Sequence, residues 1–267
     1  MSDAPAASVL AAFGVSGRPR RLAGGQGEAF RVGDVVLKRA PDPEETAWSA
    51  GVLASVSSLA FRVPRHFQTH TGAWVVDGWS AQTLLQGAHA FDRWPEVLAL
   101  CSDFHGALSS VARPDFMALR SDPWAIADRI TWGEAPLAYA SRLAPFVEPL
   151  LDRLAPVASE SQVIHGDFAG NVLFADGLAP AVIDFSPYWR PAQFAAAVVV
   201  VDAVTWHAAP ATLIDHIARE SEGAQMLLRA ELRRLLEADQ HQRQSGRDLA
   251  DDLEAHRGIV SLLVSRC

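Results

Sequence analysis

The chain has 267 residues, of which 49% are hydrophobic and 20% charged, and its formal net charge is −8. This length and apolar content allow a large buried core, arranged as one domain or as two lobes. The negative charge argues against broad binding to nucleic acid or to anionic membranes, and it slightly favours a cationic ligand.

Three features of the sequence bear on where the protein works. Residues 1–14 lack the basic start and the long apolar core of a secretion signal. The apolar run at residues 195–201 is far shorter than the roughly 20 residues needed to cross a bilayer. The two cysteines, Cys101 and Cys267, fit neither a disulfide framework nor a zinc site. We therefore expect a cytoplasmic protein that does not bind membranes.

Glycines interrupt the first strand-like region. Residues 20–23 and 28–32 read as two strands, and the loop between them contains Gly25, Gln26 and Gly27. Because glycine has no β-carbon, such a loop lets the backbone approach phosphate groups closely. From Gly25 the spacing is G-x-G-x-x-F-x-V, which a plain glycine hairpin would also give.

A lysine ends the next predicted strand. Residues 34–39 read as a strand, and its apolar run at residues 35–37 ends at Lys38, where a buried ammonium would need an anionic partner. Lysines at strand ends are also commonly solvated, so both interpretations stay open.

The helix that follows begins with a cap. Asp42 stands at the N-cap position and Pro43 at the first helical position. Glu45 shares one side of the helix with the apolar residues Trp48 and Val52, so its side chain is expected to face inward. Glu45 also occupies the capping-box position relative to Asp42, which is an alternative role.

The composition changes after two further predicted strands. Residues 61–66 lead into one of them, and residues 72–79 read as a strand that ends in a flexible joint at Asp77, Gly78 and Trp79. A simple surface turn at this joint is the alternative. Beyond it the pattern becomes helical, over residues 94–111, 139–154, 193–207 and most of 211–267. In the first of these helices, His105 is expected to be a buried hydrogen-bonding residue.

The candidate catalytic residues lie in the stretch at residues 163–185, VIHGDFAGNVLFADGLAPAVIDF. Short apolar runs flank the polar loop that holds His165, Asp167 and Asn171, and a turn then leads to a third run that ends at Asp184. A carboxylate beside an acceptor hydroxyl and oxygen ligands for magnesium are what phosphoryl transfer from ATP requires. Turn capping alone would not explain the second aspartate at the end of the next strand.

The residues HGDFAGN followed by IDF resemble the catalytic loop and the metal-binding aspartate of the aminoglycoside phosphotransferase and choline kinase-like family, which comprises small-molecule relatives of protein kinases. The resemblance implies an α+β fold of the protein-kinase type, with a small antiparallel-sheet lobe at residues 1–78 and a larger, mainly helical lobe at residues 79–267. Asn171 follows Asp167 by four positions where the family has five, so the loop is one residue shorter.

The resemblance also assigns roles, with ATP and Mg²⁺ as the expected cofactors. Asp167 would orient and deprotonate the acceptor hydroxyl, and His165 would brace the loop. Asn171 and Asp184 would hold magnesium. The expected nucleotide contacts are Gly25, Gln26 and Gly27 at the phosphates, Lys38 at the phosphates with Glu45 or Glu44 as its partner, and Asp77, Gly78 and Trp79 at the adenine through their backbone.

The sequence thus predicts an ATP-dependent phosphotransferase acting on a hydroxyl of a small molecule, such as an aminoglycoside-like compound, an amino sugar or a small alcohol. The shortened loop and the absence of a third glycine motivate the alternative, a nucleotide-binding pseudokinase or regulatory module. Tyr188 and Trp189 would stack on the acceptor or pack in the core, with the core favoured. An acidic cluster near the end is either a surface for a cationic acceptor or a solvated helix face; it comprises Asp248, Asp251, Asp252 and Glu254.

Overall fold

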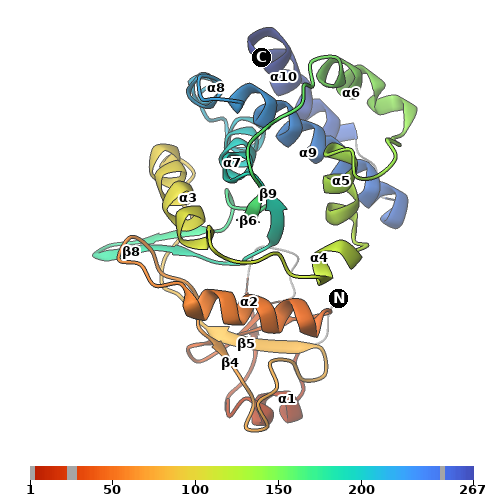
Figure 1. The fold of residues 1–267 in the computed structure, drawn as a ribbon. Helices are drawn as coiled ribbons and strands as arrows, with labels where there is room; N and C mark the ends of the chain where they lie inside the picture. Colours follow the sequence, from red (N-terminus) through yellow and green to blue (C-terminus); the bar gives the residue numbers. More distant parts are fainter. Residues whose placement is uncertain (1–3, 23–28, 247–249) are drawn as a thin grey trace. The chain divides into compact units, whose positions relative to one another are not determined.

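The structure is a computed structural model that describes residues 4–22, 29–246 and 250–267 (Figure 1). It divides into two compact units. The first unit comprises Met1–His89 and Val172–Phe185, and the second comprises Ala90–Asn171 and Ser186–Cys267. The first unit contains a five-stranded antiparallel sheet and the second is mainly helical, which confirms the predicted α+β fold class.

The sheet of the first unit has the strand order β1-β2-β3-β5-β4, and each neighbouring pair is antiparallel. Its strands are β1 (Arg20–Arg21), β2 (Ala29–Val32), β3 (Val35–Arg39), β4 (His66–Phe67) and β5 (Trp79–Thr83). Alternate side chains of β2 are buried, as expected of a sheet with one covered face. The core on this face also takes in residues of helix α1 (Ala7–Ala12); its buried members are Val9, Leu10, Phe30, Val32, Leu37, Trp79 and Ala81.

Helix α2 (Pro43–Ser55) begins as predicted. The Asp42 carboxylate accepts hydrogen bonds from the backbone N–H groups of Glu44 and Glu45, at 2.9 and 3.1 Å. Pro43 occupies the first helical position, where no intrahelical donor is lost. The cap therefore fixes the start of the helix that carries Glu45.

A hairpin from later in the chain belongs to the first unit. Strands β7 (Val172–Ala175) and β8 (Leu178–Val182) are antiparallel and joined by a turn in which Gly177 has φ +72°. Arg62 bonds this hairpin through its backbone, because its N–H donates to Pro180 O and its C=O accepts from Val182 N, both at 2.8 Å. The predicted strand, turn and strand before Asp184 are confirmed.

The strand predicted over residues 72–79 is wrong. Strand β5 begins at Trp79, and Asp77 and Gly78 form a two-residue turn closed by reciprocal backbone bonds of 2.9 Å between Val76 and Trp79. Both turn residues have positive φ, +49° and +74°, which an Asp-Gly pair adopts readily in a tight hairpin turn. The predicted lobe boundary after residue 78 consequently falls inside the first unit, directly before β5.

The second unit is built around a long helix. Helices α5 (Pro123–Thr131) and α7 (Ala192–Trp206) pack on the long helix α9 (Gly223–Ser245) (Figure 1). Strands β6 (Gln162–His165) and β9 (Pro187–Arg190) form a separate antiparallel pair. The helices are α3 (Trp94–Leu108), α4 (Phe116–Leu119), α5 (Pro123–Thr131), α6 (Ala144–Leu151), α7 (Ala192–Trp206), α8 (Thr212–Ala218), α9 (Gly223–Ser245) and α10 (Ala250–Arg266), with a 3₁₀ turn at Ser141–Leu143.

The predicted helical regions are confirmed, whereas α4, α5 and the strand β9 were not foreseen. α7 is buried on nearly all sides, consistent with a core segment. None of the described helices is long and apolar enough to cross a membrane. Both cysteines are free thiols, and Cys101 is buried in α3.

Candidate active site

The first unit brings a lysine and an aspartate together. Lys38, on β3, forms an ion pair through its ammonium with the carboxylate of Asp184, which follows β8. The Lys38 side chain is 25% exposed and that of Asp184 is 43% exposed. Burial lowers the pKa of Lys38 to about 8. The arrangement provides a cation and a carboxylate side by side, both open to a ligand.

Asp184 has an uncommon backbone conformation. Its φ is +53°, in the left-handed region that non-glycine residues rarely adopt. The next residue, Phe185, stacks on Trp48 of α2 with 6.2 Å between ring centroids and 17° between planes. Such strain persists where surrounding contacts impose it, and it often marks a functional site. Here it accompanies the placement of the carboxylate beside Lys38.

The second unit holds the His-Gly-Asp loop, which follows β6. The His165 ring is fully buried, and its Nδ1 accepts from the backbone N–H groups of Asp167 at 3.3 Å and Ser186 at 3.4 Å. The Gly166 N–H donates to Ser186 O at 2.9 Å. These bonds tie the loop to the start of β9, so the geometry of His165 is that of a brace.

His105 supports the loop from behind. Its Nε2 accepts from the backbone N–H of His165 at 3.0 Å, and its Nδ1 lies 2.6 Å from the carbonyl oxygen of Cys101. Burial lowers the pKa of His105 to about 4, so the ring is neutral and offers one donor and one acceptor. The prediction of a buried hydrogen-bonding histidine is confirmed. Phe168, also fully buried, packs against the same ring with centroids 5.7 Å apart.

Asn171 closes the shortened loop on Asp167. Its amide nitrogen donates to the Asp167 carbonyl oxygen at 2.6 Å and lies 3.3 Å from Asp167 Oδ2. The Asp167 side chain is 54% exposed, so its carboxylate is accessible to a ligand. The amide nitrogen of Asn171 is used within the loop, and its amide oxygen is the atom suited to a metal.

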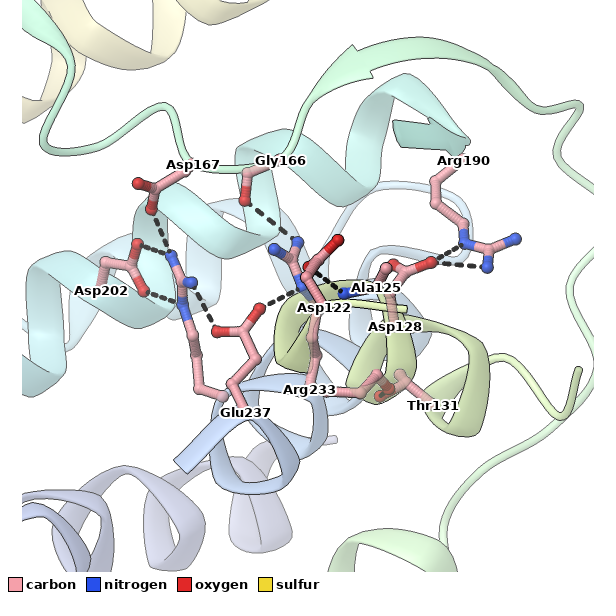
Figure 2. A network of polar contacts seen from close by, with 12 residues as sticks. Asp122, Ala125, Asp128, Thr131, Gly166, Asp167, Arg190, Asp202, Arg233 and Glu237 are labelled. Atoms are coloured by element: carbon pink, nitrogen blue, oxygen red, sulfur yellow. Dashed lines mark hydrogen bonds and ion pairs between the residues drawn. The ribbon is translucent and has the colours of Figure 1, made fainter. Parts of the chain in front are cut away.

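Two arginines of α9 that no sequence pattern indicates, Arg233 and Arg234, contact the loop; Figure 2 shows the contact of Arg233 with Gly166. Arg234 Nη2 donates to Asp167 Oδ1 at 3.0 Å, and Arg233 Nη1 donates to the Gly166 carbonyl oxygen at 3.0 Å. Burial alone would raise the pKa of Asp167, but the positive charge of Arg234 outweighs it, together with the hydrogen bond from Arg234 and the charge of Arg233, and holds that pKa below its usual range. Asp167 is therefore a carboxylate at neutral pH.

The other residues predicted to bind the nucleotide lie in the first unit or outside the residues that the structure describes. Gly25, Gln26 and Gly27 fall in residues 23–28, which lie outside the described residues. Glu45 lies in the first turn of α2, and its pairing with Lys38 stays a prediction. Trp79 is buried, with the Arg39 guanidinium 4.2 Å from its ring centroid, and its backbone N–H and C=O are both bonded to Val76.

Among the residues considered for substrate contact, one is buried in the core and one lies on an exposed surface. Tyr188 is buried between Arg120 and Arg233, at 5.0 and 4.4 Å from its ring centroid, so the core interpretation is confirmed for this residue. Within the acidic cluster, the structure describes the side chain of Glu254, which pairs with Arg257 at 3.1 Å on an exposed surface.

A sheet lysine paired with a carboxylate, and a braced His-Gly-Asp loop in a helical unit, define a phosphotransferase with the protein-kinase-like fold. The model of the phosphotransferase enzyme family APH matches residues 19–188. Since this is more than half of the chain, the protein belongs to that family. No curated protein sequence matches the chain significantly.

Solved structures share the fold. A thermostable mutant of the aminoglycoside phosphotransferase APH(4)-Ia, in a ternary complex with AMP-PNP and hygromycin B, is 17% identical, with a TM-score of 0.64 and coverage of 97% of both chains. The choline kinase LicA from Streptococcus pneumoniae is 12% identical, with a TM-score of 0.62 and 96% coverage of both chains. The spectinomycin phosphotransferase APH(9)-Ia, with ADP and spectinomycin, is 14% identical, with a TM-score of 0.60 and 97% coverage of both.

Proposed function

We propose that the protein is an ATP- and magnesium-dependent kinase that phosphorylates a hydroxyl group of a small molecule. The observation that carries this proposal is the ion pair of Lys38 with Asp184, a cation suited to nucleotide phosphates beside a carboxylate suited to magnesium. The complexes of structural neighbours with AMP-PNP and with ADP support a nucleotide as the phosphate donor.

Asp167 is the proposed acceptor-activating group. It is accessible, unprotonated at neutral pH and fixed by bonds from two sides. Phosphoryl transfer depends mainly on positioning and charge, so a carboxylate that orients the hydroxyl and accepts its proton is sufficient. His165 serves as the brace of this loop.

The donor set fits magnesium, which prefers hard oxygen ligands and retains several waters. The carboxylate of Asp184 and the amide oxygen of Asn171 would hold the ion. When bound, magnesium neutralises charge on the transferred phosphoryl group. Lys38 would contact the phosphates, with Glu45 orienting its ammonium.

The remaining nucleotide contacts rest on sequence position. Gly25, Gln26 and Gly27 are proposed for the phosphates. Asp77, Gly78 and Trp79 were proposed for the adenine, but the chain leaves the sheet only after Thr83, the last residue of β5. We therefore extend the proposal for the base to the backbone of residues 84–87, which directly follow that strand.

The acceptor is proposed to be an aminoglycoside-like compound, an amino sugar or a small alcohol. Structural neighbours are complexed with hygromycin B or spectinomycin, and another is a choline kinase. The net charge of −8 suits a cationic acceptor.

The test is magnesium-dependent transfer from ATP to a mixed panel of such acceptors by wild type, Asp167→Asn and Asp167→Ala. We expect kcat to fall by roughly 10²- to 10⁴-fold in both variants, because a positioned proton acceptor is lost. Asp103→Asn, an exposed aspartate of α3, is the matched control and should behave as wild type. Equal residual turnover in wild type and Asp167→Ala would reject the enzyme. Nucleotide binding without turnover would favour the pseudokinase, which the use of the Asn171 amide nitrogen within the loop also motivates.

A further inference from the structure

We propose that Arg233 and Arg234 of α9 are positioning residues that fix the catalytic loop for phosphoryl transfer, acting together with Asp202 and Glu237 as an arginine clamp. This inference rests on the proposed function, in which Asp167 activates the acceptor. The clamp reaches the loop from more than 60 residues away in the sequence, since Arg234 and Asp167 are separated by 67 positions.

Arg234 is held on all sides by carboxylates. Its Nε and Nη2 donate to the two oxygens of Asp202 in α7, at 2.8 and 2.5 Å, and its Nη1 donates to Glu237 Oε2 at 2.8 Å. The bond from Nη2 to Asp167 Oδ1 is the fourth. A guanidinium has five N–H donors in a rigid planar fork. The three bonds to the buried carboxylates of Asp202 and Glu237 fix the orientation of the Arg234 guanidinium. The second N–H of Nη2 therefore points toward Asp167 in one defined geometry.

Arg233 completes the clamp through the backbone. Its Nε donates to Glu237 Oε1 at 2.7 Å, while its Nη1 donates to the Gly166 carbonyl oxygen. Glu237 therefore bonds both arginines, one with each oxygen. Figure 2 shows the Arg233 guanidinium between the Glu237 carboxylate and the Gly166 carbonyl. Two successive loop residues, Gly166 by its carbonyl and Asp167 by its carboxylate, are thus attached to one turn of one helix.

The buried charges of the clamp compensate one another, so the bond to Asp167 is not needed to neutralise them. Arg233, Arg234, Asp202 and Glu237 are all buried, and their two positive and two negative charges balance without Asp167. Replacing buried ion pairs with apolar residues is often neutral or stabilising, so such a network is weak evidence of a stabilising role. This one ends on a half-exposed carboxylate, Asp167, whose side chain would otherwise sample several rotamers. The final bond restricts that freedom.

Loss of the Arg234 guanidinium should therefore slow the chemical step more than it weakens nucleotide binding. A small misplacement of a reacting group can lower the rate by about 100-fold. Lys38 and Asp184, a proposed nucleotide contact and a proposed magnesium contact, belong to the first unit, whereas the clamp belongs to the second, so the KM for ATP should change little. Lysine at position 234 keeps the charge but presents a point charge on a flexible stem, and it cannot reproduce the planar fork.

The experiment compares wild type with Arg234→Lys and with the double variant Arg234→Gln/Asp202→Asn. The double variant removes one charge of each sign, so that it leaves the buried cluster balanced. Arg257→Lys, at an exposed ion pair of α10, is the matched control. Steady-state kinetics give kcat and the KM for ATP and for the acceptor, and hydrogen exchange reports on the backbone of residues 166–171.

We expect kcat per folded molecule to fall by about 100-fold in both variants, with the KM for ATP within about threefold of wild type. We also expect faster exchange in residues 166–171, while the control matches wild type in every measurement. Unchanged kcat per folded molecule together with unchanged loop exchange would overturn the clamp and leave these residues a structural role only.

Failure of the proposed function is distinguishable from failure of the clamp. If wild type transfers no phosphate to any acceptor, the proposed function fails, and hydrogen exchange alone decides the clamp. Faster loop exchange in the folded variants then supports it, and exchange equal to wild type rejects it.

Discussion

A β-carbon at Gly166 would lie 2.3 Å from Cδ2 of Tyr188, well inside the closest approach of two carbon atoms. The φ of Gly166 is not in the left-handed region, so the requirement comes from packing rather than from backbone freedom. The ring cannot retreat easily, because it lies between the guanidinium groups of Arg120 and Arg233. The glycine of the His-Gly-Asp motif is therefore explained by a residue 22 positions later, on β9.

Gly166→Ala should displace the loop and lower the free energy of unfolding by about 1–3 kcal/mol, as overpacking of a filled site does. Denaturant unfolding measures the change. Gly170→Ala is the control in the same loop, because a β-carbon there would meet nothing within 4 Å. Equal losses at both positions would show that the Tyr188 contact is not the cause.

His105→Leu should destabilise the second unit. The substitution leaves the buried N–H of His165 without its acceptor, which costs about 1–3 kcal/mol. Urea unfolding followed by tryptophan fluorescence measures this loss. His70→Leu, at an exposed histidine, should leave the unfolding midpoint unchanged. A His105→Leu variant as stable as wild type would mean that the His165 N–H finds another acceptor.

Arg190→Met should be among the more damaging substitutions. Arg190 donates to Asp128 Oδ2 from Nε at 3.0 Å and from Nη2 at 2.6 Å, and it also pairs with Glu134. Without it, the buried Asp128 carboxylate is uncompensated, which costs about 3–5 kcal/mol. The double variant Arg190→Met/Asp128→Leu should recover much of this loss in thermal unfolding. If the double variant recovers no stability, the loss in Arg190→Met comes from altered packing and not from the uncompensated charge of Asp128.

The buried pair of His256 and Glu231 should make stability depend on pH. Burial would lower the pKa of His256, but the Glu231 carboxylate, 2.8 Å from Nδ1, outweighs burial and the opposing charge of Arg234, so the pKa is raised. The stabilisation is then fully present below the unfolded value of about 6.5 and is lost as pH rises through the higher folded value.

The measurement for this pair is the unfolding free energy of wild type and His256→Gln at about pH 6 and about pH 9. The difference between the two proteins should be larger at the lower pH. His216→Gln, at an exposed position of α8, should show no such change. A difference independent of pH would mean that the pKa of His256 is not raised in the folded protein.

Local patterns were sufficient to predict much of the fold. The cap at Asp42, the lysine strand and the hairpin before Asp184 each depend on residues close together in the sequence, and the structure has all three. The Asp77-Gly78 pair shows the limit of such patterns. It was interpreted as a joint, although the same dipeptide is a strong signal for a tight hairpin turn.

The arginines of α9 could not have been assigned from sequence. Arg233 and Arg234 stand among leucines on a long helix, where charged residues usually face solvent. Their burial results from tertiary contacts with Asp202 and with the loop, and no local spacing reports such contacts. For His105 the helical pattern predicts burial and hydrogen bonding, but not the partner His165, which is 60 residues away.

The hairpin Val172–Phe185 makes the first unit discontinuous in the chain. A fragment that ended at His89 would lack the strands that Arg62 hydrogen-bonds, and it would also lack Asp184, the partner of Lys38. Isolation of this unit by truncation should therefore give an incompletely folded product. An isolated version would have to be engineered as a fusion, with residues 172–185 grafted behind residue 89 through a designed linker.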